Sequence, residues 1–159
     1  RLCRDWSSDV CSSDLGKHLP ASLLKLIYKA KGPERMALIT DAMKAAGLPE
    51  GEYFVGSPED GQRVIVEDGV AKLADRSAFA GSVATMARVV RTVVQLAEIP
   101  LPEAVRMASA TPARIIGADR IKGSLAEGKD ADLVVFDEDD IGIRLTMVEG
   151  RIVFNELTA

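Results

Sequence analysis

Asp41 is the residue whose position first suggests chemistry. It follows residues 36–40, a run of four apolar side chains and a threonine. An unbroken apolar run is typical of a parallel strand covered on both faces. Because α/β proteins place functional groups where such strands end, the Asp41 carboxylate is a candidate for proton transfer. On these residues alone, an aspartate that only caps the following turn is the favoured alternative.

His18 is a second candidate. It stands just ahead of a helix predicted for residues 21–31, where a loop from a preceding strand would end. A lone histidine is more often a polar loop residue than a ligand-binding one. His18 is also the only histidine in the chain, whereas catalytic metal sites usually need two or more histidines, or cysteines in their place. The chain therefore cannot supply a complete site of that kind by itself.

A third candidate is the stretch Phe79, Ala80, Gly81 and Ser82, which precedes a long helix predicted for residues 83–98. Bare backbone N–H groups at a helix entry can hold an oxygen ligand or a phosphate. A helix cap explains the same residues equally well. The stretch is thus a weak signal when taken alone.

Composition excludes several other classes of function. The net charge of −4 argues against non-specific nucleic-acid binding, which needs a basic face. No apolar run approaches the length that spans a bilayer. The sequence also has no phosphate-binding P-loop, no GxSxG elbow and no dinucleotide fingerprint.

Residues 1–15 differ from the rest of the chain. They contain both cysteines and the only tryptophan, repeat Ser-Ser-Asp within eight residues, and show neither a helical nor an alternating period. We interpret them as a non-native or disordered leader, similar to translated vector sequence, and exclude them from the predicted fold. Without them the chain has no cysteine and needs no disulfide.

Two kinds of element must position the candidate residues. A helix over residues 21–31 followed by the strand at 36–40 is an αβ unit. The remaining predicted elements are strands at 53–55, 63–67 and 70–73, helices at 83–98, 102–108 and 112–116, and strands at 133–137, 143–148 and 151–154. Asp68 and Gly69 predict a tight hairpin, which does not belong in a purely parallel repeat. Thr111 is predicted to cap the short helix that follows it.

Several motifs recur together in one known family. They are residues 38–43 (Leu-Ile-Thr-Asp-Ala-Met), 80–82 (Ala-Gly-Ser) with Thr85 and Met86, 106–114 (Arg-Met-Ala-Ser-Ala-Thr-Pro-Ala-Arg), 123–125 (Gly-Ser-Leu) and 128–133 (Gly-Lys-Asp-Ala-Asp-Leu). In this order they resemble the C-terminal part of the N-acetylglucosamine-6-phosphate deacetylases, within the amidohydrolase superfamily. The resemblance covers about residues 16–156.

The resemblance implies an α/β fold, namely the C-terminal part of a TIM-like (β/α)8 barrel with strands of a small β-sandwich. The strand ending at Asp41 would be the last barrel strand. The expected divisions are residues 16–51 for the last barrel units, 52–75 for a hairpin of the sandwich, 76–117 for helices associated with the barrel, and 118–159 for C-terminal sandwich strands.

The family hydrolyses N-acetylglucosamine 6-phosphate to glucosamine 6-phosphate and acetate. The resemblance implies a divalent metal ion, zinc or similar, that activates a water, and its ligands, a glutamate and two histidines, are expected upstream of this chain. Asp41 matches the family's general base and acid, which makes catalysis the favoured role for it. The chain alone is expected to be inactive.

The resemblance also implies substrate contacts. His18 matches a histidine that contacts the sugar phosphate, although Leu15 stands where that motif has an aspartate. Phe79, Ala80 and Gly81 match the loop at the substrate, with a simple helix entry left as an even alternative. The implied partner is a small amino-sugar phosphate, with no nucleic acid or membrane, in a cytoplasmic homo-oligomer.

Two other functions remain open. The complete protein could be a different amidohydrolase, acting on a cyclic amide or another acyl-amino sugar, because Asp41 would serve either reaction. Alternatively, the chain could be a structural fragment without catalytic function. Part of a barrel exposes strand edges and apolar faces, so we expect the chain to be poorly soluble or to self-associate, whether it is a fragment of an enzyme or a structural fragment.

Overall fold

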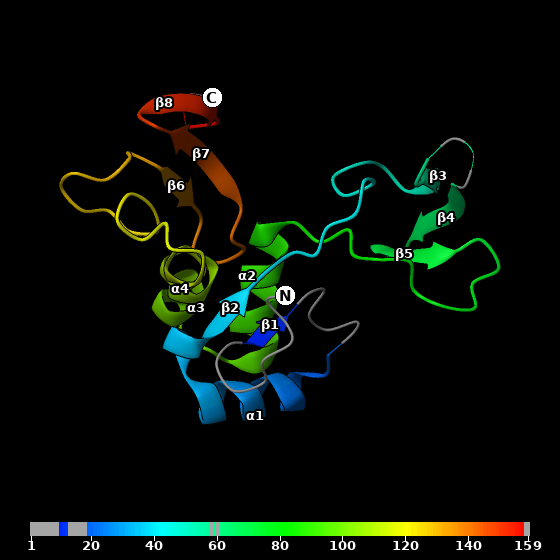
Figure 1. The fold of residues 1–159 in the computed structure, drawn as a ribbon, viewed down its shortest axis with the longest axis horizontal. Helices are drawn as coiled ribbons and strands as arrows, with labels where there is room; N and C mark the ends of the chain where they lie inside the picture. The colour runs from blue at the N-terminus through cyan, green and yellow to red at the C-terminus, as the bar shows by residue number, and fades with distance from the viewer. Residues whose placement is uncertain (1–9, 13–18, 58, 60, 158–159) are drawn as a thin grey trace.

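The computed structural model describes residues 10–12, by their backbone alone, and residues 19–57, 59 and 61–157. The helices gather together, with one antiparallel sheet above them and the other to their right (Figure 1). None of the helices in this part of the chain has the length and apolar composition that a membrane crossing requires. Parallel strand pairing beside helices confirms the α/β class, whereas a closed barrel stays a prediction.

Strand β2 (Met36–Leu38) is the buried strand that the sequence predicts. Each of its three residues is at most 2% exposed, because helices cover it, and this explains the unbroken apolar run. It pairs in parallel with β1 (Val10–Ser12). Strand β1 lies in the stretch expected to be a leader; the structure gives these three residues a strand, and the rest of that stretch lies outside the described residues.

The αβ unit is confirmed. Helix α1 (Ala21–Lys31) follows Pro20, and Gly32 ends it with a φ of 72°. A 3-10 turn, η1 (Pro33–Arg35), then leads directly into β2. Leu24 is the fully buried residue of α1, and it anchors the helix to the core.

Three further helices complete the helical body: α2 (Met86–Ala97), α3 (Leu101–Ala108) and α4 (Ala110–Ile115). Apolar residues of α1, β2, α2 and α3 form one cluster, whose fully buried large members are Leu24, Met36, Leu38, Val89, Val93, Ile99 and Met107. The predicted start of the long helix at residue 83 was too early. The side chain of Thr85 caps α2 by accepting the N–H of Arg88 at 3.3 Å.

The predicted cap of the short helix was also wrong. Helix α4 begins at Ala110, with Ser109 as its cap residue. Thr111 is buried, and its hydroxyl donates to the carbonyl of Pro33 at 2.7 Å. This side chain therefore ties α4 to the turn that precedes β2, a contact between segments far apart in the sequence.

The first antiparallel sheet consists of β3 (Gly51–Val55), β4 (Gln62–Glu67) and β5 (Val70–Leu73) in that order. Asp68 and Gly69 both have positive φ, 54° and 69°. Two such residues between paired strands form the tight hairpin that matches strand twist. The hairpin predicted from Asp68-Gly69 is confirmed.

The second antiparallel sheet consists of β6 (Leu133–Phe136), β7 (Ile143–Val148) and β8 (Arg151–Asn155). The terminal hairpin, which turns at Glu149 and Gly150, is confirmed. In the described residues, the two antiparallel sheets share neither hydrogen bonds nor a core cluster. The joint sandwich expected for residues 52–75 and 118–159 therefore stays a prediction.

Candidate active site

Asp41 lies three residues beyond the end of β2, because the strand stops at Leu38 and not at residue 40 as predicted. Its side chain is exposed, and its φ of 47° lies in the left-handed region, which aspartate tolerates better than most residues. Among the described residues, no backbone N–H donates to the Asp41 carboxylate. The capping interpretation thus lacks the hydrogen bond that defines a cap.

The segment that follows Asp41 lies beside the candidate loop. Ala42 and Ser82 form a parallel bridge, and the N–H of Met43 donates to the carbonyl of Ser82 at 2.8 Å. In Figure 1, the chain leaving β2 runs next to the chain that leads into α2. The structure therefore places the segment that follows Asp41 beside the end of the loop, at Gly81 and Ser82.

The loop is held from its other side by β5. The N–H of Ala80 donates to the carbonyl of Ala71 at 2.8 Å, and Phe79 forms an antiparallel bridge with Lys72. Phe79 stays half exposed, so its ring can contact a ligand. The loop thus pairs with β5 at residues 79 and 80, and with the segment that follows Asp41 at Ser82.

Close packing joins the two segments. Gly81 has a φ of 102°, and a Cβ added to it would lie 3.3 Å from the Cβ of Met43. A small apolar cluster underlies the contact. Its buried members are Ala45, Val66 and Ala71, with Met43, Tyr53, Ala80 and Val83 packed against them. The antiparallel sheet therefore supports the candidate site.

The simple helix-entry explanation of the loop is weakened by the position of the cap. Thr85 caps α2, so Gly81 and Ser82 lie outside the cap. Sequence reasoning missed Met43 and Ser82 as the residues that join the loop to the Asp41 segment. In the sequence, Met43 belongs to the same motif as Asp41, and Ser82 to the same motif as Gly81. Membership in these motifs does not indicate that the two motifs are in contact.

Charged side chains near the site stabilise the sheet. Lys72 donates to Glu67 at 2.9 Å, and Arg76 donates to the same carboxylate at 2.9 and 3.1 Å. These hydrogen bonds, from Arg76 first and Lys72 second, lower the pKa of Glu67 to about 2. Glu67 is therefore ionised at neutral pH and suits a structural ion pair better than proton transfer.

The described residues do not fit a metal site. Nowhere in the described ranges do three or more His, Cys, Asp or Glu side chains gather so as to hold an ion. His18, the predicted phosphate contact, lies outside the described residues, so its contact stays a prediction. The candidate site is thus a carboxylate beside a loop.

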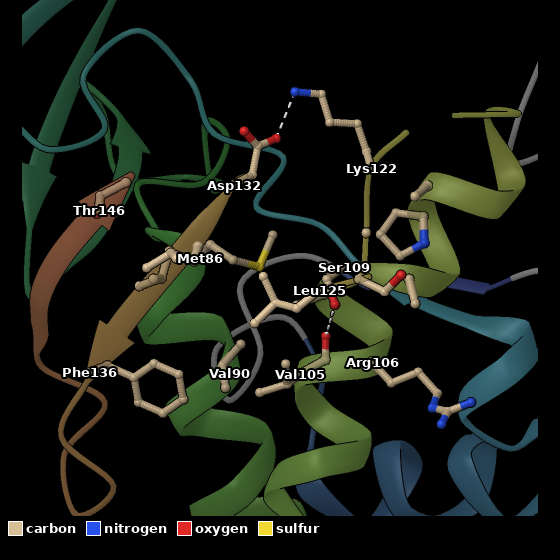
Figure 2. Close-up of a pocket in the computed structure, with 18 of the residues that line it drawn as sticks. Met86, Val90, Val105, Arg106, Ser109, Lys122, Leu125, Asp132, Phe136 and Thr146 are labelled. Carbon is tan, nitrogen blue, oxygen red and sulfur yellow. Dashed lines mark hydrogen bonds and ion pairs between the residues drawn. The ribbon is translucent and has the colours of Figure 1, made fainter. Parts of the chain in front are cut away.

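A separate cavity of about 1030 Å³ lies between the helices and the second antiparallel sheet (Figure 2). Its wall is mostly apolar, with Met86, Val90, Val105, Leu125 and Phe136 among the lining side chains. Asp41, Phe79, Ala80 and Gly81 do not line it. This lining suits packing against an apolar surface more than it suits catalysis.

A polar network closes one rim of this cavity. The Lys122 ammonium lies 2.7 Å from carboxylate oxygens of both Asp130 and Asp132, and Figure 2 shows its pairing with Asp132. Hydrogen bonds to Asp130 and then Asp132 raise the pKa of Lys122. The Gly-Lys-Asp-Ala-Asp motif, which directly precedes β6, is thus joined by ion pairs to Lys122 in the loop that follows α4.

Comparison with known proteins identifies the family. The amidohydrolase family profile matches residues 16–153. The N-acetylglucosamine-6-phosphate deacetylase of Vibrio furnissii is 35% identical over 91% of this chain, and the chain spans about a third of that relative's length (34%). A relative from Escherichia coli K12, which carries the name "Putative N-acetylgalactosamine-6-phosphate deacetylase", is 37% identical over 86% of this chain and 78% of its own length.

Solved structures agree. The N-acetylglucosamine-6-phosphate deacetylase of Pasteurella multocida superposes with a TM-score of 0.82 at 32% identity, over 94% of this chain and 38% of that one. A variant of the Mycobacterium smegmatis enzyme, solved in complex with N-acetyl-D-glucosamine-6-phosphate, gives 0.81 at 37% identity, over 92% and 38%. The resemblance to these deacetylases is confirmed, and the chain belongs to the amidohydrolase family.

Proposed function

We propose that this chain is the C-terminal part of an enzyme that hydrolyses N-acetylglucosamine 6-phosphate to glucosamine 6-phosphate and acetate. The observation that carries the proposal is the hydrogen bond from Met43 to Ser82, which holds the Asp41 segment against the loop at residues 79–81. The relatives named above support the substrate class. In the complete protein we expect a TIM-like barrel, a β-sandwich and a homo-oligomer in the cytoplasm.

Asp41 would perform the proton transfers. Its exposed carboxylate takes the proton of the attacking water and then delivers it to the amide nitrogen, which leaves poorly unless protonated. Phe79, Ala80 and Gly81 would contact the sugar beside it, and His18 its phosphate. One carboxylate thus serves as base and then as acid at the same nitrogen.

Amidohydrolases generally depend on a metal. The described residues provide no ligand set for one, so the divalent ion, zinc or similar, would be held by residues of the complete protein outside this chain. The contribution of this chain is restricted to proton transfer and substrate contact. The exposed position of Asp41 is compatible with that division.

Replacing Asp41 by asparagine in the complete enzyme tests the proposal. Asparagine keeps the size but cannot accept the water's proton, so we expect kcat for acetate release to fall by about 10²–10⁴. Binding of N-acetylglucosamine 6-phosphate, measured by calorimetry, should change little. Asp68→Asn, at the exposed hairpin turn, is the matched control. Unchanged acetate release by D41N would overturn the assignment.

N-acetylgalactosamine 6-phosphate is a second candidate substrate. The E. coli relatives named for it are 37% identical to this chain, between the 35% and 39% of two relatives named for N-acetylglucosamine 6-phosphate. The two sugars differ only in the configuration at C4. The ratio of kcat/KM for the two phosphates, measured on the complete enzyme, decides between them. No acetate from either would favour an amidohydrolase acting on a cyclic amide.

The chain alone should be inactive. It would contribute a proton-transfer carboxylate, but its described residues offer no cluster of side chains that could bind a metal ion. We therefore expect the purified 159-residue chain to release no acetate from N-acetylglucosamine 6-phosphate in the presence of added zinc. A colorimetric acetate assay checks this, with the complete enzyme as the positive control. Release of acetate by the chain would show that its own residues suffice.

A further inference from the structure

Ser82 is a fully buried polar residue at the junction between the loop and the Asp41 segment. Its Oγ accepts the N–H of Ala84 at 3.0 Å, which closes a local turn. Ala84 is itself buried, at 1% exposed. Without the serine hydroxyl, this N–H would therefore be left in the interior without that partner, which is costly.

The backbone of the same residue holds the other segment. The carbonyl of Ser82 accepts the N–H of Met43, two residues beyond Asp41, at 2.8 Å. The side-chain turn to Ala84 restricts the backbone of Ser82 and hence the direction of this carbonyl. Ser82 thus links two segments: its hydroxyl binds the N–H of Ala84, and its carbonyl binds the N–H of Met43.

Asp41 has few other restraints. Its carboxylate is exposed and receives no hydrogen bond from described backbone N–H groups, and its φ of 47° lies in the left-handed region. The direction of its side chain therefore depends on how the two flanking segments are held. β2 holds one flank, and the contact between Met43 and Ser82 holds the other.

We propose that Ser82 is a positioning residue for Asp41: the hydroxyl of Ser82 fixes its own carbonyl, which anchors Met43 and so orients the carboxylate. The catalytic meaning of this orientation rests on the proposed function. The coupling between the Ser82 hydroxyl and Asp41 does not rest on it and can be measured without substrate. The hydroxyl acts through Met43 and need not touch the substrate.

The test uses the complete enzyme without substrate and two readouts. One is the hydrogen-exchange rate of the Met43 amide, measured by residue-resolved mass spectrometry. The other is the carboxyl resonance of Asp41 in protein labelled with [4-13C]aspartate, assigned by its loss in Asp41→Asn. In Ser82→Ala we expect Met43 to exchange about tenfold faster and the Asp41 resonance to move.

Two further variants make the test decisive. Ser82→Cys keeps the buried volume but offers only a weak acceptor, so it should shift both readouts in the same direction if the alanine variant does not fold. Thr111→Ala removes another buried hydroxyl bonded to a backbone group, far from the loop. It should lower stability and leave both readouts as in the wild type.

Wild-type readouts in the two Ser82 variants would overturn the proposal, and so would equal shifts in Thr111→Ala, since general loosening would then explain them. Neither result bears on acetate release, which tests the deacetylase function separately. A shift confined to the Ser82 variants supports the coupling even if the complete enzyme acts on a different amide.

Discussion

At the scale of single residues, the site depends on two backbone conformations that are uncommon. Asp41 and Gly81 both have positive φ, 47° and 102°. Aspartate tolerates the left-handed region, whereas a φ near 100° strongly favours glycine. The left-handed conformation lies in the segment that follows β2, and the glycine allows the loop to approach Met43 closely. Both features bring the Asp41 segment and the loop together.

Gly81→Ala should therefore be destabilising. The new Cβ would meet Met43 at 3.3 Å in addition to the strain of the positive φ, and we expect a loss of about 1–3 kcal/mol in the free energy of unfolding. Urea denaturation measures it. Gly47→Ala is the matched control, because Gly47 has a φ of 79° but nothing within 4 Å of the added Cβ. An equal loss in both variants would show that the contact with Met43 contributes nothing.

At the scale of elements, the β3–β5 sheet supports the loop, and ion pairs stabilise the sheet. Glu67 on β4 accepts hydrogen bonds from Lys72 on β5 and from Arg76 just beyond it. Arg88 on α2 donates to the carbonyl of Gly69 at 2.7 Å. The helix that follows the loop is thus attached to the hairpin turn, so that sheet, loop and helix are joined.

The Glu67 ion pairs predict a pH dependence of stability. Because the pKa of Glu67 is lowered from 4.5 to about 2 on folding, its contribution is complete above pH 4.5 and is lost as the pH falls toward 2. Thermal melting followed by circular dichroism between pH 6 and 2 should show this loss. Glu67→Gln should reduce the slope, and Glu127→Gln, for which no ion pair is seen in the described residues, should not. Equal slopes in both variants would refute the assignment.

At the scale of the whole molecule, the chain leaves a large apolar surface uncovered. All five residues of β8 are exposed, including Ile152, Val153 and Phe154. Strand β8 is also at the edge of its sheet, and the apolar cavity lies between that sheet and the helices. Exposed apolar edge strands promote pairing between molecules. We therefore expect self-association to occur through the exposed edge of β8.

Val153→Lys should reduce this association. A charge on an edge strand opposes pairing with a second chain, so sedimentation velocity should show a larger monomer fraction than for the wild type. Leu48→Lys places the same charge at an exposed apolar residue in a loop and serves as the control. A sharp monomer peak with cooperative melting for the wild-type chain would contradict the prediction.

Local signals in the sequence predicted most elements. The αβ unit, the Asp68-Gly69 hairpin and the terminal strands were confirmed because each depends on patterns within a few neighbouring residues. The boundaries near the site were less accurate. The start of α2 moved to Met86 and the end of β2 moved to Leu38, because capping and side-chain contacts, and not propensity, decide where elements end.

The sequence by itself determined the element types, the motifs and the family, and it selected Asp41 and the loop at residues 79–81 as candidates. Only the tertiary structure decided that these segments touch, that Ser82 joins them, and that Thr111 binds Pro33. The physical reason is that these contacts link residues about 40 to 80 positions apart. Local patterns of hydrophobicity and turn chemistry do not predict which distant backbone groups will form hydrogen bonds with one another.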